Sequence, residues 1–256
     1  MWYDIGSYSH PGNCRDTNQD SFLVCTGNVE KKNYALLAVA DGMGGMEKGE
    51  EASALAVKYL EQWWYERLPE AQGKTLNWLR IKDSLVITID QINWSIYTRA
   101  DNREGRSGTT LTLAFVCQNE FMIMHVGDSR AYTVKNSMAS QLTKDQTWCQ
   151  QELDEGRLTK SVIANHPNRH ALISALGVEP HYRLEKFRGI MENGLFLCSD
   201  GFYNCLDEGN GIRFSTHKSA QKMLEIAADQ VLRGVADDNL TGVLLITKPF
   251  GWAIKR

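Results

Sequence analysis

The chain has 256 residues, of which 43% are hydrophobic and 23% charged, and its formal net charge is −3. This composition is typical of a folded globular protein and excludes long disordered regions. The small negative charge gives no general attraction to nucleic acid or anionic membranes, so we expect neither as a partner. No repeat, low-complexity tract or Pro/Gly/Ser-rich linker divides the sequence, which favours a single domain over 1–256.

The pattern of hydrophobic and turn-forming residues predicts interleaved strands and helices. In chain order we expect strands over Tyr3–Ser9, Ser21–Thr26 and Tyr34–Ala40, helices along Ala52–Trp63 and Trp78–Ile96, strands over Thr110–Gln118, Phe121–Val126 and Arg130–Lys135, a helical excursion within Leu142–Leu176, strands over Tyr182–Arg188 and Leu195–Ser199, a helix along Ala220–Val231, and a last strand over Gly242–Thr247. Turn residues such as Gly27-Asn28 and Asn119-Glu120 indicate antiparallel hairpins.

Features that would place the chain outside the cytoplasm are missing from the sequence. Met1–Gly6 lacks the basic stretch and apolar core of a signal peptide. The longest apolar runs, such as Tyr34–Ala40, are too short to span a bilayer. The six cysteines are scattered and form no C-x-x-C pair, which favours reduced thiols over disulfides or a zinc site. We therefore expect a cytoplasmic protein.

Aspartates stand where apolar strand-like runs end or begin. Asp41, Asp128 and Asp200 each follow such a run, and Asp237-Asp238 precede the last one. Because a buried strand fixes the residue at its tip, these carboxylates can meet at one edge of the core although they lie far apart in sequence. One Asp-Gly after a strand is most often only a turn. Four such sites together favour a metal centre.

The residue types of this cluster indicate which metal ions it would bind and which substrate group would lie beside them. Converging carboxylates repel one another unless protons, basic groups or cations relieve the repulsion. Oxygen ligands without His or Cys suit Mg²⁺ or Mn²⁺ better than zinc. Arg15 can hold a phosphate through two parallel hydrogen bonds. Taken alone, Arg15 would more often be a solvated surface residue.

With these residues in view, the chain resembles the metal-dependent protein phosphatases of type 2C, in their compact bacterial form. The resemblance covers nearly the whole sequence and consists of eight short strings in the family's order. These are R-D-T-N-Q-D (Arg15–Asp20), A-D-G-M-G-G (Ala40–Gly45), S-G-T-T (Ser107–Thr110), V-G-D-S-R (Val126–Arg130), L-T-K-D-Q-T (Leu142–Thr147), S-A-L-G (Ser174–Gly177), C-S-D-G (Cys198–Gly201) and D-D-N-L-T (Asp237–Thr241).

The resemblance implies an α+β fold, a four-layer αββα sandwich of two antiparallel β-sheets flanked by helix pairs, with the metals at one end. It implies that two or three Mn²⁺ or Mg²⁺ ions bind there. Asp41 would bridge two of them, Asp200 and Asp238 would complete the first site, and the Gly42 carbonyl would join the second. Asp128, together with Asp200, would hold a more weakly bound third ion.

Other positions of the family pattern concern substrate binding, and at some of them this chain has a different residue. By the resemblance, Arg15 binds the phosphate and Asp20 orders metal-bound water. Gln19 stands where the family often has Glu, so it would contact the second ion only through water. Met43 replaces a His that is a proposed proton donor in many relatives, which leaves a metal-bound water as the expected donor. Gln146 also replaces a common His, and we assign it no role.

The function that the resemblance implies is hydrolysis of phosphoserine and phosphothreonine in proteins, by direct attack of a metal-bridging water. Phosphorylated proteins would be the substrates, in signalling with a cognate Ser/Thr kinase, and we expect a monomer. Residues 147–168 correspond to a variable flap beside the active site.

Competing interpretations remain open at this point. Gln19 gives some support to a pseudophosphatase that only binds phosphoproteins. A Mg²⁺-dependent nuclease shares the acidic cluster but lacks a basic track for a polyanion. A cysteine phosphatase is disfavoured, because neither Cys14 nor Cys198 lies in a C-x5-R loop. Gly42–Gly45 lacks the G-x-G-x-x-G spacing of a nucleotide site.

Overall fold

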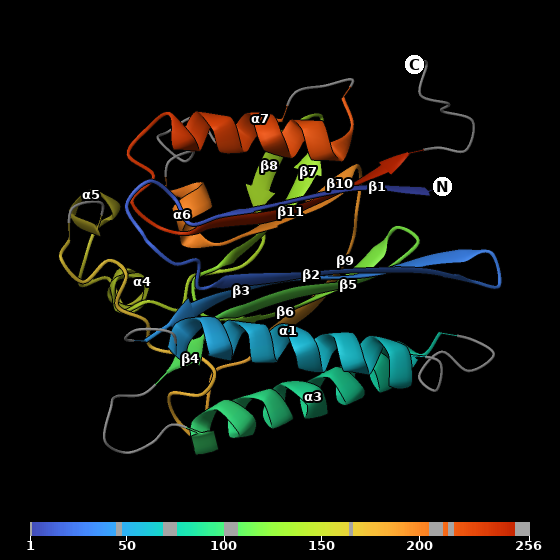
Figure 1. Cartoon of the computed structure of the whole chain (residues 1–256), viewed down its shortest axis with the longest axis horizontal. Coiled ribbons are helices and arrows are strands. Elements are labelled where there is room, and N and C mark those ends of the chain that lie inside the picture. The colour runs from blue at the N-terminus through green and yellow to red at the C-terminus, as the bar shows by residue number, and fades with distance from the viewer. Residues whose placement is uncertain are drawn as a thin grey trace.

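Two antiparallel sheets, stacked face to face, form the centre of the molecule (Figure 1). The computed structural model describes residues 2–44, 48–68, 76–99, 107–163, 166–204, 212–214 and 218–248. In this part of the chain, the first sheet has the order β1 (Trp2–His10), β11 (Leu240–Lys248), β10 (Gly194–Cys198), β7 (Arg130–Lys135) and β8 (Met138–Gln141). The second has the order β2 (Asp20–Val29), β3 (Lys32–Met43), β5 (Leu111–Cys117), β6 (Glu120–Val126) and β9 (Glu185–Ile190), and the short β4 (Gly108–Thr109) pairs with β3.

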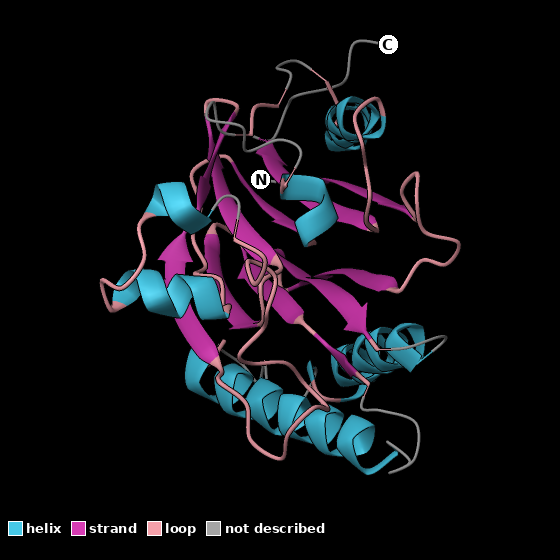
Figure 2. Ribbon diagram, turned by 90° about the vertical axis from the view of Figure 1, so that its left-hand side faces the viewer, coloured by secondary structure: helices cyan, strands magenta, loops and turns pink. Residues whose placement is uncertain are grey.

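Helices cover the outer face of each sheet. Helices α1 (Lys48–Glu66) and α3 (Trp78–Arg99) cover the second sheet, and α7 (Ala220–Leu232) with the one-turn α6 (Asp200–Tyr203) covers the first (Figure 1). Two short helices, α4 (Trp148–Asp154) and α5 (Lys160–Ile163), lie at one end of the sandwich, which faces the viewer in Figure 2. The expected α+β sandwich of two antiparallel sheets with flanking helices is confirmed.

Alternation along the strands builds the hydrophobic layers between these elements. In β3, Leu36 packs with the α1 and α3 side chains, whereas the adjacent Leu37 and Val39 point into the space between the sheets. In β11, Leu244 packs with α7, and Leu245 packs between the sheets. Successive side chains of a strand point to opposite faces, so strands covered on both sides are apolar at every position. This explains the continuous hydrophobic runs in the sequence.

The hairpin turns differ from the sequence predictions. The turn expected at Gly27-Asn28 is wrong, because these residues pair with Tyr34 and Asn33 within the hairpin and the chain turns at Glu30 and Lys31 instead. The turn expected at Asn119-Glu120 is displaced by one residue, since Glu120 already pairs with Cys117. Strand pairing thus extends each hairpin beyond its hydrophobic residues.

The segment predicted as a helical excursion within Leu142–Leu176 contains helices, and its two ends lie next to each other. It contains α4 and α5, and the Thr147 side chain caps α4 by accepting a hydrogen bond from the Gln150 N–H. Thr147 also forms a β-bridge with Leu172, which joins the two ends of the segment. Residues 147–168, the flap of the sequence analysis, therefore leave and rejoin the sandwich at nearly the same place.

The described cysteines are free thiols, as expected, and Cys205 lies outside the described residues. In the described ranges, no helix is long and apolar enough to cross a membrane.

Candidate metal centre

Asp20 and Asp41 face each other across the β2–β3 pair. Asp20 is 8% exposed, and its Oδ2 accepts a hydrogen bond of 2.7 Å from the Ser199 hydroxyl. Its Oδ1 is buried and has no hydrogen-bond partner among the described residues. A buried carboxylate oxygen without a partner carries an uncompensated desolvation cost. A cation or its coordinated water would supply the missing interaction.

The predicted carboxylates raise one another's pKa values. Burial, followed by the charges of Asp20, Asp200 and Asp128, raises the pKa of Asp41 well above its ordinary value. Burial also raises the pKa of Asp20 to about 7, with further contributions from Asp200 and Asp238. The pKa of Asp128 is raised by burial and by the charge of Asp200. Bound cations relieve this kind of repulsion, so the oxygen-rich set fits divalent metal ions.

His170 joins this cluster, although the sequence analysis gave it no role. Its Nδ1 lies 3.4 Å from Asp200 Oδ2. One ligand atom each from Asp128, His170 and Asp200 lies within 4.8 Å of the others, so the three side chains could hold one ion. No local pattern in the sequence connects His170 with the Asp-Gly strings, because it lies just after the flap and away from the strand ends in sequence.

Gly42 and Gln19 lie where the end of β3 meets the start of α1. The Gly42 N–H donates to the Gln19 carbonyl oxygen at 3.1 Å. A methyl group on Gly42 would lie 2.1 Å from the Gly49 carbonyl oxygen and 2.6 Å from that of Gln19. The Gln19 side chain also packs against Gly49. The glycines therefore allow three segments to approach beside Asp41.

Replacing Gly42 by alanine is expected to destabilise the protein, because the methyl group would collide with backbone atoms that cannot rotate away. We expect a loss of about 2 kcal/mol or more, or roughly 4–8 °C in Tm, measured by thermal unfolding in EDTA. Gly234→Ala is the control, since a methyl group there meets only Val231 O at 3.3 Å. Equal melting temperatures for the two variants would show that the segments at Gly42 are not tightly packed.

Arg15 and Asp238 form an ion pair at the edge of the cluster, with Arg15 Nη2 2.9 Å from Asp238 Oδ2. The loop that carries Arg15 is tied to β11 by Asn239, whose amide group donates to Pro11 O at 3.0 Å and to Thr17 O at 2.9 Å. Its Oδ1 accepts from the Gln19 N–H at 2.8 Å. Asn239, to which sequence reasoning gave no role, thus positions the Arg15 loop beside the carboxylates.

Gln146 holds the turn that carries Asp128. Its Oε1 accepts a hydrogen bond of 3.0 Å from the Gly127 N–H, and the left-handed φ of 105° at Gly127 explains the glycine at this point. The Tyr203 hydroxyl donates to Asp128 O at 3.1 Å. Gln146 therefore has a structural role that the sequence did not reveal. Met43 pairs with Gly108 in the adjacent β3–β4 ladder and offers no proton.

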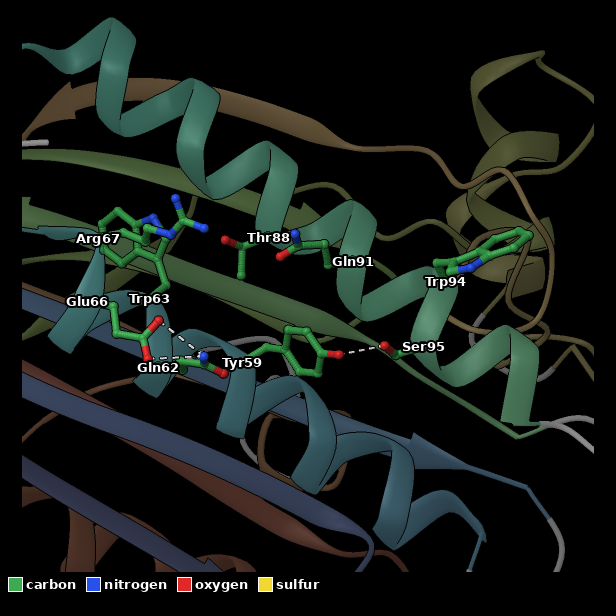
Figure 3. Close-up of a pocket in the computed structure, with 9 residues that line it drawn as sticks. All are labelled: Tyr59, Gln62, Trp63, Glu66, Arg67, Thr88, Gln91, Trp94 and Ser95. Atoms are coloured by element: carbon green, nitrogen blue, oxygen red, sulfur yellow. Dashed lines mark hydrogen bonds between the residues drawn. The ribbon is translucent and has the colours of Figure 1, made fainter. Parts of the chain in front are cut away.

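Two cavities differ in their relation to this cluster. A cleft of about 770 Å³ begins at Asp128 and runs beneath the flap. Another cavity, of about 400 Å³, lies between α1 and α3 (Figure 3), and none of its lining residues belongs to the acidic cluster. Figure 3 shows Tyr59 bonded to Ser95 across it, and Gln62 bonded to Glu66 at one wall. The cleft at Asp128 therefore adjoins the candidate site, whereas the cavity between α1 and α3 does not.

Comparisons with known proteins agree with this geometry. The sequence matches the protein phosphatase 2C family over residues 13–244. It is 34% identical over 202 residues to the serine/threonine phosphatase stp of Listeria monocytogenes, with 77% of each chain covered. It is 33% identical over 227 residues to the serine/threonine protein phosphatase PstP of Mycobacterium tuberculosis, covering 85% of this chain and 42% of the relative.

Solved structures show the same fold. The S. agalactiae serine/threonine phosphatase superposes with a TM-score of 0.85 at 23% identity, covering 96% of this chain and 100% of the other. The catalytic domain of PstP, solved with two manganese ions, superposes with a TM-score of 0.76 at 26% identity, covering 96% and 99%.

Proposed function

The chain belongs to the protein phosphatase 2C family, and we propose on this premise that it is a metal-dependent hydrolase of phosphoserine and phosphothreonine in proteins. The observation that carries the proposal is the carboxylate cluster around the buried Asp20 and the half-buried Asp41, with its unpartnered Asp20 oxygen. Phosphoproteins are the substrates, because the family and its named relatives act as serine/threonine phosphatases.

The proposal includes two or three Mn²⁺ or Mg²⁺ ions held by this cluster. Asp41 would bridge two ions, Asp200 and Asp238 would complete the first site, and Gly42, with Gln19 acting through water, would serve the second. Asp128 and Asp200 would hold a third ion, and His170 lies beside this position. The manganese ions in the PstP structure support the choice of metal.

When bound, the cations supply Lewis acidity, which activates water and neutralises charge on the phosphoryl group. The chain's own residues provide orientation. The Arg15 guanidinium offers parallel donors to phosphoryl oxygens, and Asn239 holds the loop that carries it. Ser199 fixes one oxygen of Asp20, so the other oxygen can accept a hydrogen bond from the reacting water and orient it.

Covalent catalysis by cysteine does not fit the described site. Cys198 is fully buried, and burial raises the pKa of its thiol well above the ordinary value, so it stays protonated at neutral pH. The alternative of a pseudophosphatase rests on Gln19 alone. It is not favoured, because a pure binding module gains nothing from buried carboxylates that repel one another.

The proposal extends to the setting in which the enzyme acts. It comprises one catalytic domain over 1–256 with residues 147–168 as its flap, acting as a cytoplasmic monomer on the products of a cognate Ser/Thr kinase. The family match over 13–244 supports the single domain. A kinase is the class of enzyme that must supply phosphoserine and phosphothreonine substrates.

The test is an assay of the purified protein with p-nitrophenyl phosphate and a phosphothreonine peptide, in Mn²⁺, in Mg²⁺ and in EDTA. We expect phosphate release with the metals, none in EDTA, and none from the Asp238→Ala variant, whose folding is checked by circular dichroism. Folded wild-type protein that releases no phosphate with either metal would favour the pseudophosphatase. Normal turnover by Asp238→Ala would remove Asp238 from the metal site.

A further inference from the structure

The cleft beneath the flap, of about 770 Å³, adjoins the metal centre at Asp128. Its outer wall is formed by flap residues and its inner wall by the ends of β7 and α6. The outer wall includes the flap residues Gln150, Leu153, Lys160 and Ile163, together with Arg169, which follows the flap directly. A phosphoserine or phosphothreonine side chain is short, so a peptide whose phosphate lies at the carboxylate cluster must place its flanking residues against the adjacent surface. The cleft is such a surface, because it shares Asp128 with the cluster.

Outside the metal centre, the described lining of this cleft is more basic than acidic. Its acidic residues are Asp128 and Asp145, and its basic ones are Arg130, Lys160 and Arg169. Asp145, on the inner wall, accepts two hydrogen bonds from Arg130, of 2.8 and 2.7 Å. The charge of Asp145 is therefore compensated within the chain, which leaves the wall with a net positive charge outside the metal centre.

Lys160 and Arg169 supply positive charge to the same wall. Lys160 is exposed and forms no hydrogen bond or ion pair with another described residue. Arg169 donates from Nε to His170 Nε2 at 2.7 Å, and His170 in turn lies 3.4 Å from Asp200. Arg169 is therefore held beside the metal centre, whereas Lys160 lies on α5 with its charge uncompensated by the described part of the chain.

We propose that this cleft binds the segment flanking the phosphorylated residue, and that Lys160 and Arg169 select substrates with an anionic side chain in that segment. The anion is a carboxylate or a second phosphate, since both accept charge-assisted hydrogen bonds from cationic side chains. Leu153 and Ile163 provide apolar contact for the stem of that side chain. This inference rests on the proposed phosphatase function and names the substrates that the site prefers.

The test uses a set of phosphothreonine peptides. In each peptide a single flanking position carries Glu, Gln, Lys or phosphoserine, and every flanking position is varied in this way. The ratio of kcat/KM for the Glu peptide to that for the Lys peptide is measured for wild type, Lys160→Glu and Lys135→Glu. Lys135 is the control, an exposed lysine that pairs with Glu192 at the opposite end of β7 from Arg130, and the fold of this variant is checked by its Tm. A separate arm compares phosphoserine with Glu and identifies which anion is bound.

We expect wild type to favour the anionic peptides roughly tenfold at one or more positions, and Lys160→Glu to abolish or reverse that ratio. Lys135→Glu should keep the wild-type ratio. Identical ratios for wild type and Lys160→Glu, with p-nitrophenyl phosphate hydrolysed by wild type, would overturn the role of the cleft and leave the proposed function standing. Absence of p-nitrophenyl phosphate hydrolysis by wild type in every metal would overturn the proposed function, and this inference with it.

Discussion

The Asp41→Asn variant is expected to lose phosphatase turnover by about a thousandfold or more, while its metal-free form becomes more stable than wild type. Asparagine has nearly the same size as aspartate but carries no charge, so by the role proposed for Asp41 it would weaken the binding of divalent cations. A thousandfold loss corresponds to roughly 4 kcal/mol of transition-state stabilisation. In the absence of metal, the same substitution removes the repulsion that Asp41 has with Asp20, Asp200 and Asp128.

Two measurements on one preparation test both parts of this prediction. Turnover of a phosphothreonine peptide is measured with saturating Mn²⁺, and Tm is measured in EDTA at neutral pH, where we expect an increase of about 3 °C or more. The control is Asp83→Asn, at an exposed carboxylate of α3 far from the cluster, which should change neither quantity. A lower Tm for Asp41→Asn in EDTA would show that Asp41 contributes net stability to the metal-free fold, contrary to the electrostatic argument.

Local signals in the sequence were enough to predict antiparallel hairpins and to group the aspartates, whereas the two-sheet sandwich was predicted from the family resemblance. Apolar runs such as Tyr34–Ala40 end in Asp-Gly, and the strand that contains Leu36 and Leu37 is buried on both faces. Strand tips at one end of a sandwich are neighbours whatever their separation in sequence. The aspartates could therefore be grouped before the fold was known.

Residues that position this cluster could not be predicted, because their roles depend on contacts between distant segments. Asn239 bonds to Pro11 and Thr17, which are 228 and 222 positions away. Ser199 bonds to Asp20 across 179 positions. His170 follows just after the flap, and only the return of the chain to the sandwich at Leu172 places it beside Asp200. Side chains of this kind have no local pattern that distinguishes them from ordinary turn residues.

Metal-free protein is expected to lose stability as the pH rises from about 4 to about 7. Burial raises the pKa of Asp20 from 3.8 to about 7 in the folded chain, and the pKa values of Asp41 and Asp128 are raised as well. Across this range the unfolded chain releases these protons first, so the folded state binds more protons and each rise in pH favours unfolding. The stabilising effect of protonation is complete below about pH 4 and is lost as the pH passes the raised pKa values.

Divalent cations should reverse this trend, because they neutralise the same carboxylates without requiring protons. We expect the Tm measured in EDTA to fall by about 5 °C or more between pH 5 and pH 7.5, and the Tm measured in Mn²⁺ to stay level or rise over the same range. In EDTA, Asp20→Asn should show a shallower pH dependence than wild type, whereas Asp83→Asn should match wild type. A Tm in EDTA that rises with pH would mean that the buried carboxylates are ionised and stabilised within the fold itself, and that metal binding is not needed to relieve their repulsion.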